Sequence, residues 1–232
     1  METYDQWCEL RTWRAMGLET NVEILDMITG TAFILVPLYE RPVVWTNLHI
    51  ILFAHMFWLG VGTVVYHSIP NTVINGYPLT YLMDDVPIVV TCTFLSSIYV
   101  WHLNKFLNKL AVFGTSAGLI GWMLFLIISI YFVSAVVRNA ITVTLPVLIF
   151  TVYSFLVFGA RSARVWLLLT TSLVIWLINR ELCAQMYCLA LFHAIYHIFI
   201  SFSLWGAGCM GIELHYANER LQEALISMNT LV

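Results

Sequence analysis

Long and almost uncharged hydrophobic runs recur along the whole chain of 232 residues, and they restrict its fold more than any other feature. Hydrophobic residues make up 61% of the chain and charged residues only 10%, whereas soluble proteins carry about 25% charged residues. A run of about 20 apolar residues is long enough to cross the hydrocarbon core of a bilayer as a helix. The sequence therefore predicts an all-α integral membrane protein.

Seven such runs are present, and we predict a bundle of seven transmembrane helices. The first run is the weakest, because Glu23 and Asp26 lie in its opening turns. The connections are short, which leaves no room for a second folded domain. The predicted spans cover residues 22–39, 44–67, 80–101, 109–134, 140–159, 163–182 and 187–211.

The ends of the chain are polar, and we treat them separately from the domain at residues 22–212. Residues 1–21 form an N-terminal segment without the apolar core of a cleavable signal peptide. Residues 213–232 form a tail that can fold as a short amphipathic helix at the membrane surface. A net charge of −3 and no cluster of basic residues argue against nucleic acid binding, and nothing in the sequence indicates an obligate protein partner.

Basic residues indicate the orientation, because cytoplasmic loops are enriched in lysine and arginine. Six of them fall on the side of the C-terminus and four on the side of the N-terminus. We therefore predict a non-cytosolic N-terminal segment and a cytosolic tail. The six are Arg41, Lys105, Lys109, Arg161, Arg164 and Arg220, and the four are Arg11, Arg14, Arg138 and Arg180.

Histidines in the last run point to a metal site. His193 and His197 lie four residues apart, so both imidazoles share one face of a helix. In the predicted topology, His67 ends the second span and Asp84 opens the third at the same membrane level. Ionisable side chains within a membrane are costly and mark functional sites. Three histidines from two helices match the three protein ligands and one open position of catalytic zinc.

Two neighbouring residues would complete a hydrolytic site. Zinc lowers the pKa of bound water to about 7, and Asp84 is predicted to accept the proton that such water releases. Thr63 lies four residues before His67, so its hydroxyl can be directed at a developing oxyanion. Asp85 is expected to have a structural role at the start of its helix.

Four segments, GVGTVVYH, LMDDVPIV, WLINRELC and HAIYHIFISFS, resemble in order the signatures of the alkaline ceramidases, and the similarity covers nearly the whole chain. The resemblance implies a seven-helix zinc hydrolase of the endoplasmic reticulum or Golgi membrane that cleaves ceramide or related sphingolipids to a sphingoid base and a fatty acid. It implies His67, His193 and His197 as zinc ligands and Asp84 as the general base. Thr63 stands where the family usually has a serine.

The family also carries a calcium site, built from a DWCE-like motif and a glutamate at the start of the first span. This chain reads QWCELR, in which Gln6 and Arg11 replace an aspartate and an asparagine. Because calcium prefers several anionic or carbonyl oxygens, these changes make calcium binding doubtful, and Arg11 is a candidate to replace the ion. The residues of this degenerate site are Trp7, Glu9 and Glu23.

Other features also follow from the resemblance. Cys8 and Cys183 match family cysteines, and in an oxidising lumen they are expected to form a disulfide, with Cys188 as a competing partner. The connection between His67 and Asp84 is longer than usual in the family. Asn179 replaces an aspartate that is common there.

Two other functional classes remain open. One is a receptor-like, non-enzymatic member of the wider superfamily that includes the progestin and adiponectin receptors, although DDVP and WLINRELC favour the ceramidases. The other is a haem or di-iron oxidoreductase, which would require histidines on opposite faces or more histidine-rich boxes. The remaining histidines within the spans, His49 and His55, are expected to make ordinary polar contacts between helices.

Overall fold

A computed structural model describes residues 23–69, 73–74, 77–105, 158–182 and 190–229, together with positions 17, 152, 155 and 156. Within these ranges every element except one pair of short strands is helical. The elements are α2 (Ile24–Gly30), α3 (Ala32–Tyr39), α4 (Asn47–Ser68), β1 (Val73–Ile74), β2 (Tyr77–Pro78), α5 (Leu79–Lys105), the 3-10 helix η2 (Gly159–Ser162), α9 (Ala163–Leu182) and α10 (Ala190–Asn229).

Three of these helical stretches are long and apolar enough to cross a membrane, which indicates a membrane protein. They are Asn47–Ser68, Gly159–Asn179 and Leu191–Met228, and they overlap predicted spans two, six and seven. Shorter apolar helices at Ile24–Tyr39 and Val86–Tyr99 fall within predicted spans one and three. Span four and most of span five lie outside the described residues, as do Trp7, Cys8, Glu9, Arg11 and Cys183.

Large apolar side chains also cover the outer faces of these helices. On α4, Ile50 and Phe57 are exposed, and on α9 Leu167 and Leu177 are exposed. A helix that is apolar on its exposed faces as well as its buried ones is suited to contact with lipid. The exposure therefore agrees with the hydropathy of the runs.

The first predicted span is interrupted. Helix α2 ends at Gly30 and α3 begins at Ala32, with Thr31 between them at φ −63° and ψ −15°. The Thr31 hydroxyl donates a hydrogen bond to the carbonyl of Ile28 at 2.6 Å, inside the turn. Pro37 follows within α3 and cannot donate a backbone hydrogen bond. The run is therefore two short helices in sequence.

The tail is helical, as the sequence predicts, but it continues the last helix and is not a short helix of its own. Helix α10 has 40 residues and passes through the predicted domain boundary at residue 212. The residues after Gly211 include the strong helix formers glutamate, leucine, glutamine and alanine and no proline, so nothing in them ends the helix. Within this part, His215 Nε2 lies 3.2 Å from Glu219 Oε1, one turn further along.

The structure comprises two compact units. The first contains the described residues up to Thr91 and from Ala163 to Gly206, and the second contains those from Cys92 to Ser162 and from Ala207 onward. In the second unit, the Tyr99 hydroxyl donates to the carbonyl of Ala207 at 2.6 Å. The candidate site lies entirely within the first unit.

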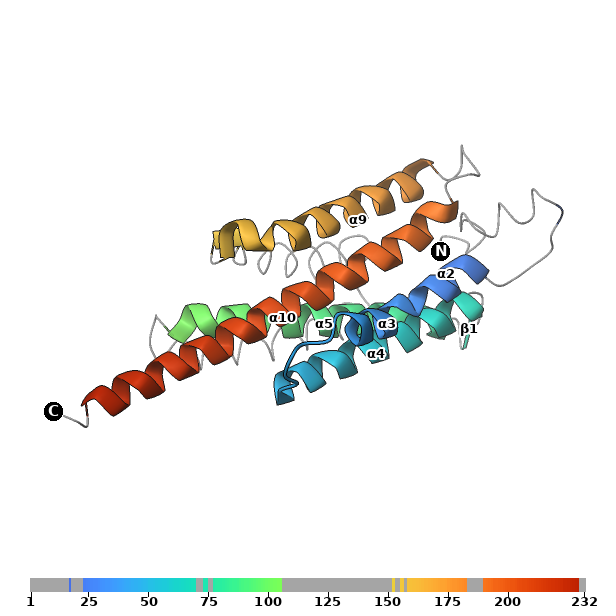
Figure 1. Ribbon diagram of the computed structural model, residues 1–232. Coiled ribbons are helices and arrows are strands. Elements are labelled where there is room, and N and C mark those ends of the chain that lie inside the picture. Colours follow the sequence, from blue (N-terminus) through green and yellow to red (C-terminus); the bar gives the residue numbers. More distant parts are fainter. Residues whose placement is uncertain are drawn as a thin grey trace. The chain divides into compact units, whose positions relative to one another are not determined.

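Within the first unit, α2 and α3 pack along α4 (Figure 1). The contact is close because glycines lie in it. A Cβ atom on Gly60 would lie 2.7 Å from Ile34 Cγ1, and one on Gly30 would lie 2.8 Å from Thr63 Cγ2. Small residues let helix backbones approach one another in membrane proteins. This packing brings the start of α2 to the end of α4.

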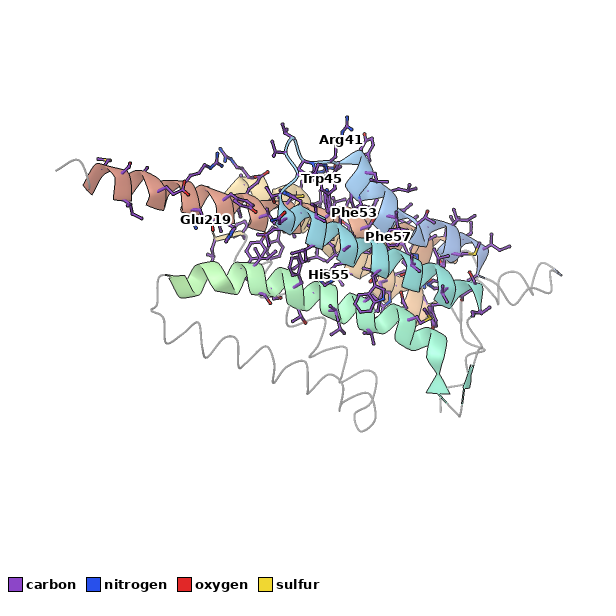
Figure 2. All side chains as sticks on the ribbon, turned by 90° about the horizontal axis from the view of Figure 1, so that it is seen from below. Arg41, Trp45, Phe53, His55, Phe57 and Glu219 are labelled. Carbon is purple, nitrogen blue, oxygen red and sulfur yellow. The ribbon has the colours of Figure 1, made fainter. Side chains whose placement is uncertain are left out.

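Aromatic side chains cover the other end of α4. Trp45 and Phe53 are labelled at this end in Figure 2, and their ring centroids are 5.9 Å apart. Trp45 also lies 6.0 Å from Trp205 of α10, measured between ring centroids. His49 caps the helix here, because the Thr46 backbone N–H donates to His49 Nδ1 at 3.3 Å. His49 thus serves its own helix through this bond.

Candidate metal centre

Three buried histidines meet in the first unit. His67 lies in the last turn of α4, and His193 and His197 lie in the first two turns of α10. One potential ligand atom from each lies within 4.8 Å of the other two. The ring centroids are 5.4 Å apart for His67 and His193, 5.1 Å for His67 and His197, and 4.6 Å for His193 and His197. The group can hold a metal ion.

A carboxylate supports the first of these histidines. Glu23 Oε2 lies 2.5 Å from His67 Nδ1, and the two side chains are 0% and 1% exposed. The Glu23 backbone N–H also donates to the His67 carbonyl at 3.0 Å. Because a carboxylate can only accept, the bond assigns the proton to Nδ1 and makes Nε2 the ligating nitrogen. Carboxylate–histidine–metal arrangements of this kind orient the ring and raise its basicity.

The same carboxylate belongs to a second group of possible ligands. Glu23, Asp26 and His67 each offer an atom within 4.8 Å of the others, and all three are buried. An acidic pocket therefore adjoins the histidines. Glu23 was expected in a degenerate calcium site, and in the described part of the chain it contacts His67. The other residues of that expected site, Trp7 and Glu9, lie outside the described residues.

Thr63, one helical turn before His67 on α4, forms a pair with Asp84 of α5. The Thr63 hydroxyl donates to Asp84 Oδ1 at 2.5 Å, and the Thr63 side chain is 1% exposed. Thr63 was expected to direct its hydroxyl at an oxyanion. In this structure the proton is instead given to Asp84, so the threonine orients the carboxylate.

The backbone explains why these two residues meet. Pro87 has no N–H, so the carbonyl of Met83, four residues earlier in α5, receives no helical hydrogen bond from it. That carbonyl points to Gly62 on α4, where a Cβ atom would overlap it. The absent side chain lets the helices touch at this point. Thr63 and Asp84, the next residues along each helix, are thereby brought within hydrogen-bond distance.

Two polar residues that were not predicted as site residues also reach the histidines. Thr29 Oγ1 lies 3.3 Å from His197 Nδ1, and Asn179 Nδ2 lies 3.5 Å from His193 Nδ1. Signals for both exist in the sequence. Thr29 follows Asp26 by three residues and so shares its helix face. Asn179 is an amide inside the apolar run WLIN, where a polar group requires a partner.

A hollow of about 440 Å³ opens beside Thr29. Most of the residues around it are apolar, and they belong to α2, α3 and α10. On its lining are Ile28, Leu35, Val36, Ile198 and Phe202. Apolar surface therefore continues from the outside of these helices to Thr29, the residue that contacts His197.

Comparison of the chain with models of protein families, with curated proteins and with solved structures finds no match in any of the three.

Proposed function

We propose that the protein is an intramembrane zinc-dependent amidase, an alkaline ceramidase that hydrolyses ceramide to a sphingoid base and a free fatty acid. The observation that carries this proposal is the buried group of His67, His193 and His197, together with a carboxylate, Asp84, that is held by Thr63 one helical turn before His67. The proposal includes seven spans in the endoplasmic reticulum or Golgi membrane, with a lumenal N-terminus and a cytosolic tail.

The donor set fits zinc better than a hard cation. Three imidazoles and an open position are typical of catalytic zinc, whereas calcium and magnesium prefer oxygen ligands. His67, His193 and His197 would hold the ion. When bound, zinc would polarise the amide carbonyl of the substrate and lower the pKa of a water molecule.

The protein's own residues would handle the proton. Asp84 would accept a proton from water and return it to the amine that leaves when the amide bond breaks. Thr63 holds Asp84 in one orientation through its hydrogen bond of 2.5 Å. Glu23 holds His67 in the tautomer that leaves Nε2 for the metal. A positioned acid–base group of this kind contributes about 10²- to 10⁴-fold to rate.

The depth of the site suits a membrane lipid with an amide in its head region. His67 lies one residue from the end of a 22-residue helix, and His193 is the fourth residue of α10. Both therefore lie near the ends of apolar helices, at the level where a ceramide amide meets water while its chains remain in hydrocarbon. The apolar hollow beside Thr29 supports the presence of a hydrocarbon chain close to the histidines.

Ceramide turnover by membranes that contain the full chain tests the proposal. The unaltered protein is compared with His197→Ala and Asp84→Asn, with released sphingoid base as the readout. His55→Ala is the matched control, because His55 lies on α4 with His67 but belongs to neither group of possible ligands. We expect release by the unaltered protein and the control, and loss of at least about 10²-fold in both site variants.

The opposite result has a clear meaning. If the unaltered protein binds zinc but releases no base from ceramides of several acyl lengths and sphingoid bases, the amidase proposal is wrong. A receptor-like role would then replace it.

A further inference from the structure

All three clustered histidines meet a polar group at the same ring nitrogen. His67 Nδ1 meets Glu23, His193 Nδ1 meets Asn179, and His197 Nδ1 meets Thr29. These partners come from three places in the chain: just before α2, within α2 and within α9. A repeated contact at Nδ1 leaves the same atom, Nε2, to face a common ligand in each ring.

The direction of the bond at His197 follows from the other contacts of Thr29. The Thr29 hydroxyl donates its hydrogen to the carbonyl of Leu25 at 2.8 Å. A hydroxyl has one hydrogen and two lone pairs, so its oxygen can then only accept from His197. Nδ1 of His197 therefore carries the proton and Nε2 carries the lone pair.

The bond at His193 requires the amide of Asn179 to be turned over. The nitrogen and oxygen of an asparagine amide are nearly indistinguishable by shape, and the hydrogen-bond network decides between them. As placed, Asn179 directs Nδ2 at His193, and its Oδ1 is buried with no hydrogen-bond partner among the described residues. Rotating the amide by half a turn lets Oδ1 accept the Nδ1–H of His193, the orientation that leaves Nε2 for a metal, and turns Nδ2 to the place that Oδ1 held.

We propose that Glu23, Thr29 and Asn179 are positioning residues that hold the Nδ1–H of the three histidines and so present three Nε2 atoms to one metal ion. The inference rests on the metal site of the proposed function. One of these partners is a carboxylate and two are neutral. Loss of such a partner typically costs about 10- to 100-fold in metal affinity.

Zinc affinity of the purified full chain in detergent tests the assignment, measured by competition with a chromophoric zinc chelator. Thr29→Val keeps the shape of the side chain and removes the acceptor. Thr170→Val is its matched control, since Thr170 also donates to a carbonyl four residues earlier, at 2.6 Å, on an exposed face of α9. We expect zinc affinity to fall about 10- to 100-fold in Thr29→Val and to stay unchanged in Thr170→Val.

Asn179 is tested by a pair of variants of similar size. Asn179→Leu removes the acceptor, and we expect zinc affinity to fall about 10- to 100-fold, the range for loss of such a partner. Asn179→Asp keeps an acceptor oxygen and should retain at least the zinc affinity of the unaltered protein. The visible spectrum of bound Co²⁺ gives a second readout: it should change in Thr29→Val and Asn179→Leu and stay the same in Asn179→Asp and Thr170→Val.

Two results would overturn the inference: zinc affinity and Co²⁺ spectra unchanged in Thr29→Val and Asn179→Leu, or an Asn179→Asp variant as weak as Asn179→Leu. Neither measurement uses ceramide. A protein that binds zinc through these partners but cleaves no ceramide would therefore contradict the proposed function and leave this inference standing.

Discussion

Thr63 shows how one side chain can change the chemistry expected of a site. Its hydroxyl has a single hydrogen, and the structure assigns that hydrogen to Asp84 Oδ1. The added methyl group, compared with serine, restricts the rotamers of this side chain. Thr63 therefore holds the carboxylate firmly.

Substitution of Thr63 tests this role. Thr63→Val keeps the shape and removes the hydrogen bond, so we expect kcat for ceramide to fall about 10- to 100-fold, the range for loss of an orienting partner. Thr63→Ser keeps the hydroxyl and should retain kcat within about threefold of the unaltered protein, because a charge-assisted bond is preserved. Equal kcat values for the valine and serine variants would show that the hydroxyl is not needed.

Sequence reasoning predicted the site residues that lie close together in the chain and missed some contacts between residues far apart in it. The spacing of His193 and His197 places them on one helix face without further information. The contact of Glu23 with His67 spans 44 positions and depends on α2 beginning beside the end of α4. No local pattern encodes that approach, so sequence reasoning did not connect Glu23 with His67.

At the scale of elements, the decisive contact is that of α4 with α5. The hydropathy of the runs predicted both helices, but not the point at which they touch. The two helices touch where Gly62 of α4 meets the carbonyl of Met83 of α5. Pro87 leaves this carbonyl without its helical hydrogen bond. Sequence reasoning also missed the interruption at Thr31. Apolar residues continue on both sides of Thr31, and Thr31 itself keeps helical dihedral angles, so the hydropathy shows no break there.

Enlarging Gly62 should separate the two helices. In Gly62→Ala the new methyl group would overlap backbone, which cannot move aside as a side chain can. We expect the free energy of unfolding to fall by about 1–3 kcal/mol, the usual cost of overpacking, and ceramide turnover to fall with it as the bond from Thr63 to Asp84 breaks.

Gly206→Ala is the control for this experiment. Its new methyl group would meet only a side-chain atom, Val165 Cγ2, at 3.0 Å. Thermal unfolding in detergent and ceramide turnover are measured for both variants. A Gly62→Ala protein as stable and as active as Gly206→Ala would contradict the role given to this contact.

At the scale of the whole molecule, polar contacts agree with the predicted alternation of the spans. Arg164, at the start of α9, pairs with Glu40, at the end of α3, at 2.5 Å. The predicted topology places these two ends on one side of the membrane. His67 and His193 meet where the predicted topology has span two end and span seven begin. Hydropathy thus predicted which of these helix ends meet, while span four and most of span five lie outside the described residues.

Cysteine labelling tests the sidedness. Arg41 lies in the loop between α3 and α4, and its exposed side chain is labelled in Figure 2. Ile69 follows the other end of α4 and is 49% exposed. In sealed microsomes that carry Arg41→Cys or Ile69→Cys on a cysteine-free chain, an impermeant maleimide should label only position 41. Labelling of position 69 alone would reverse the orientation, and labelling of both would contradict a membrane-spanning α4.

Removal and return of the metal test the central claim most directly. The purified full chain is analysed for metal by mass spectrometry, dialysed against a zinc chelator, assayed with ceramide and then supplied with zinc or calcium. We expect about one zinc ion per chain, as for a single three-histidine site, with turnover lost on chelation and restored by zinc but not by calcium. Turnover that persists in metal-free protein, or that calcium alone restores, would contradict a zinc hydrolase.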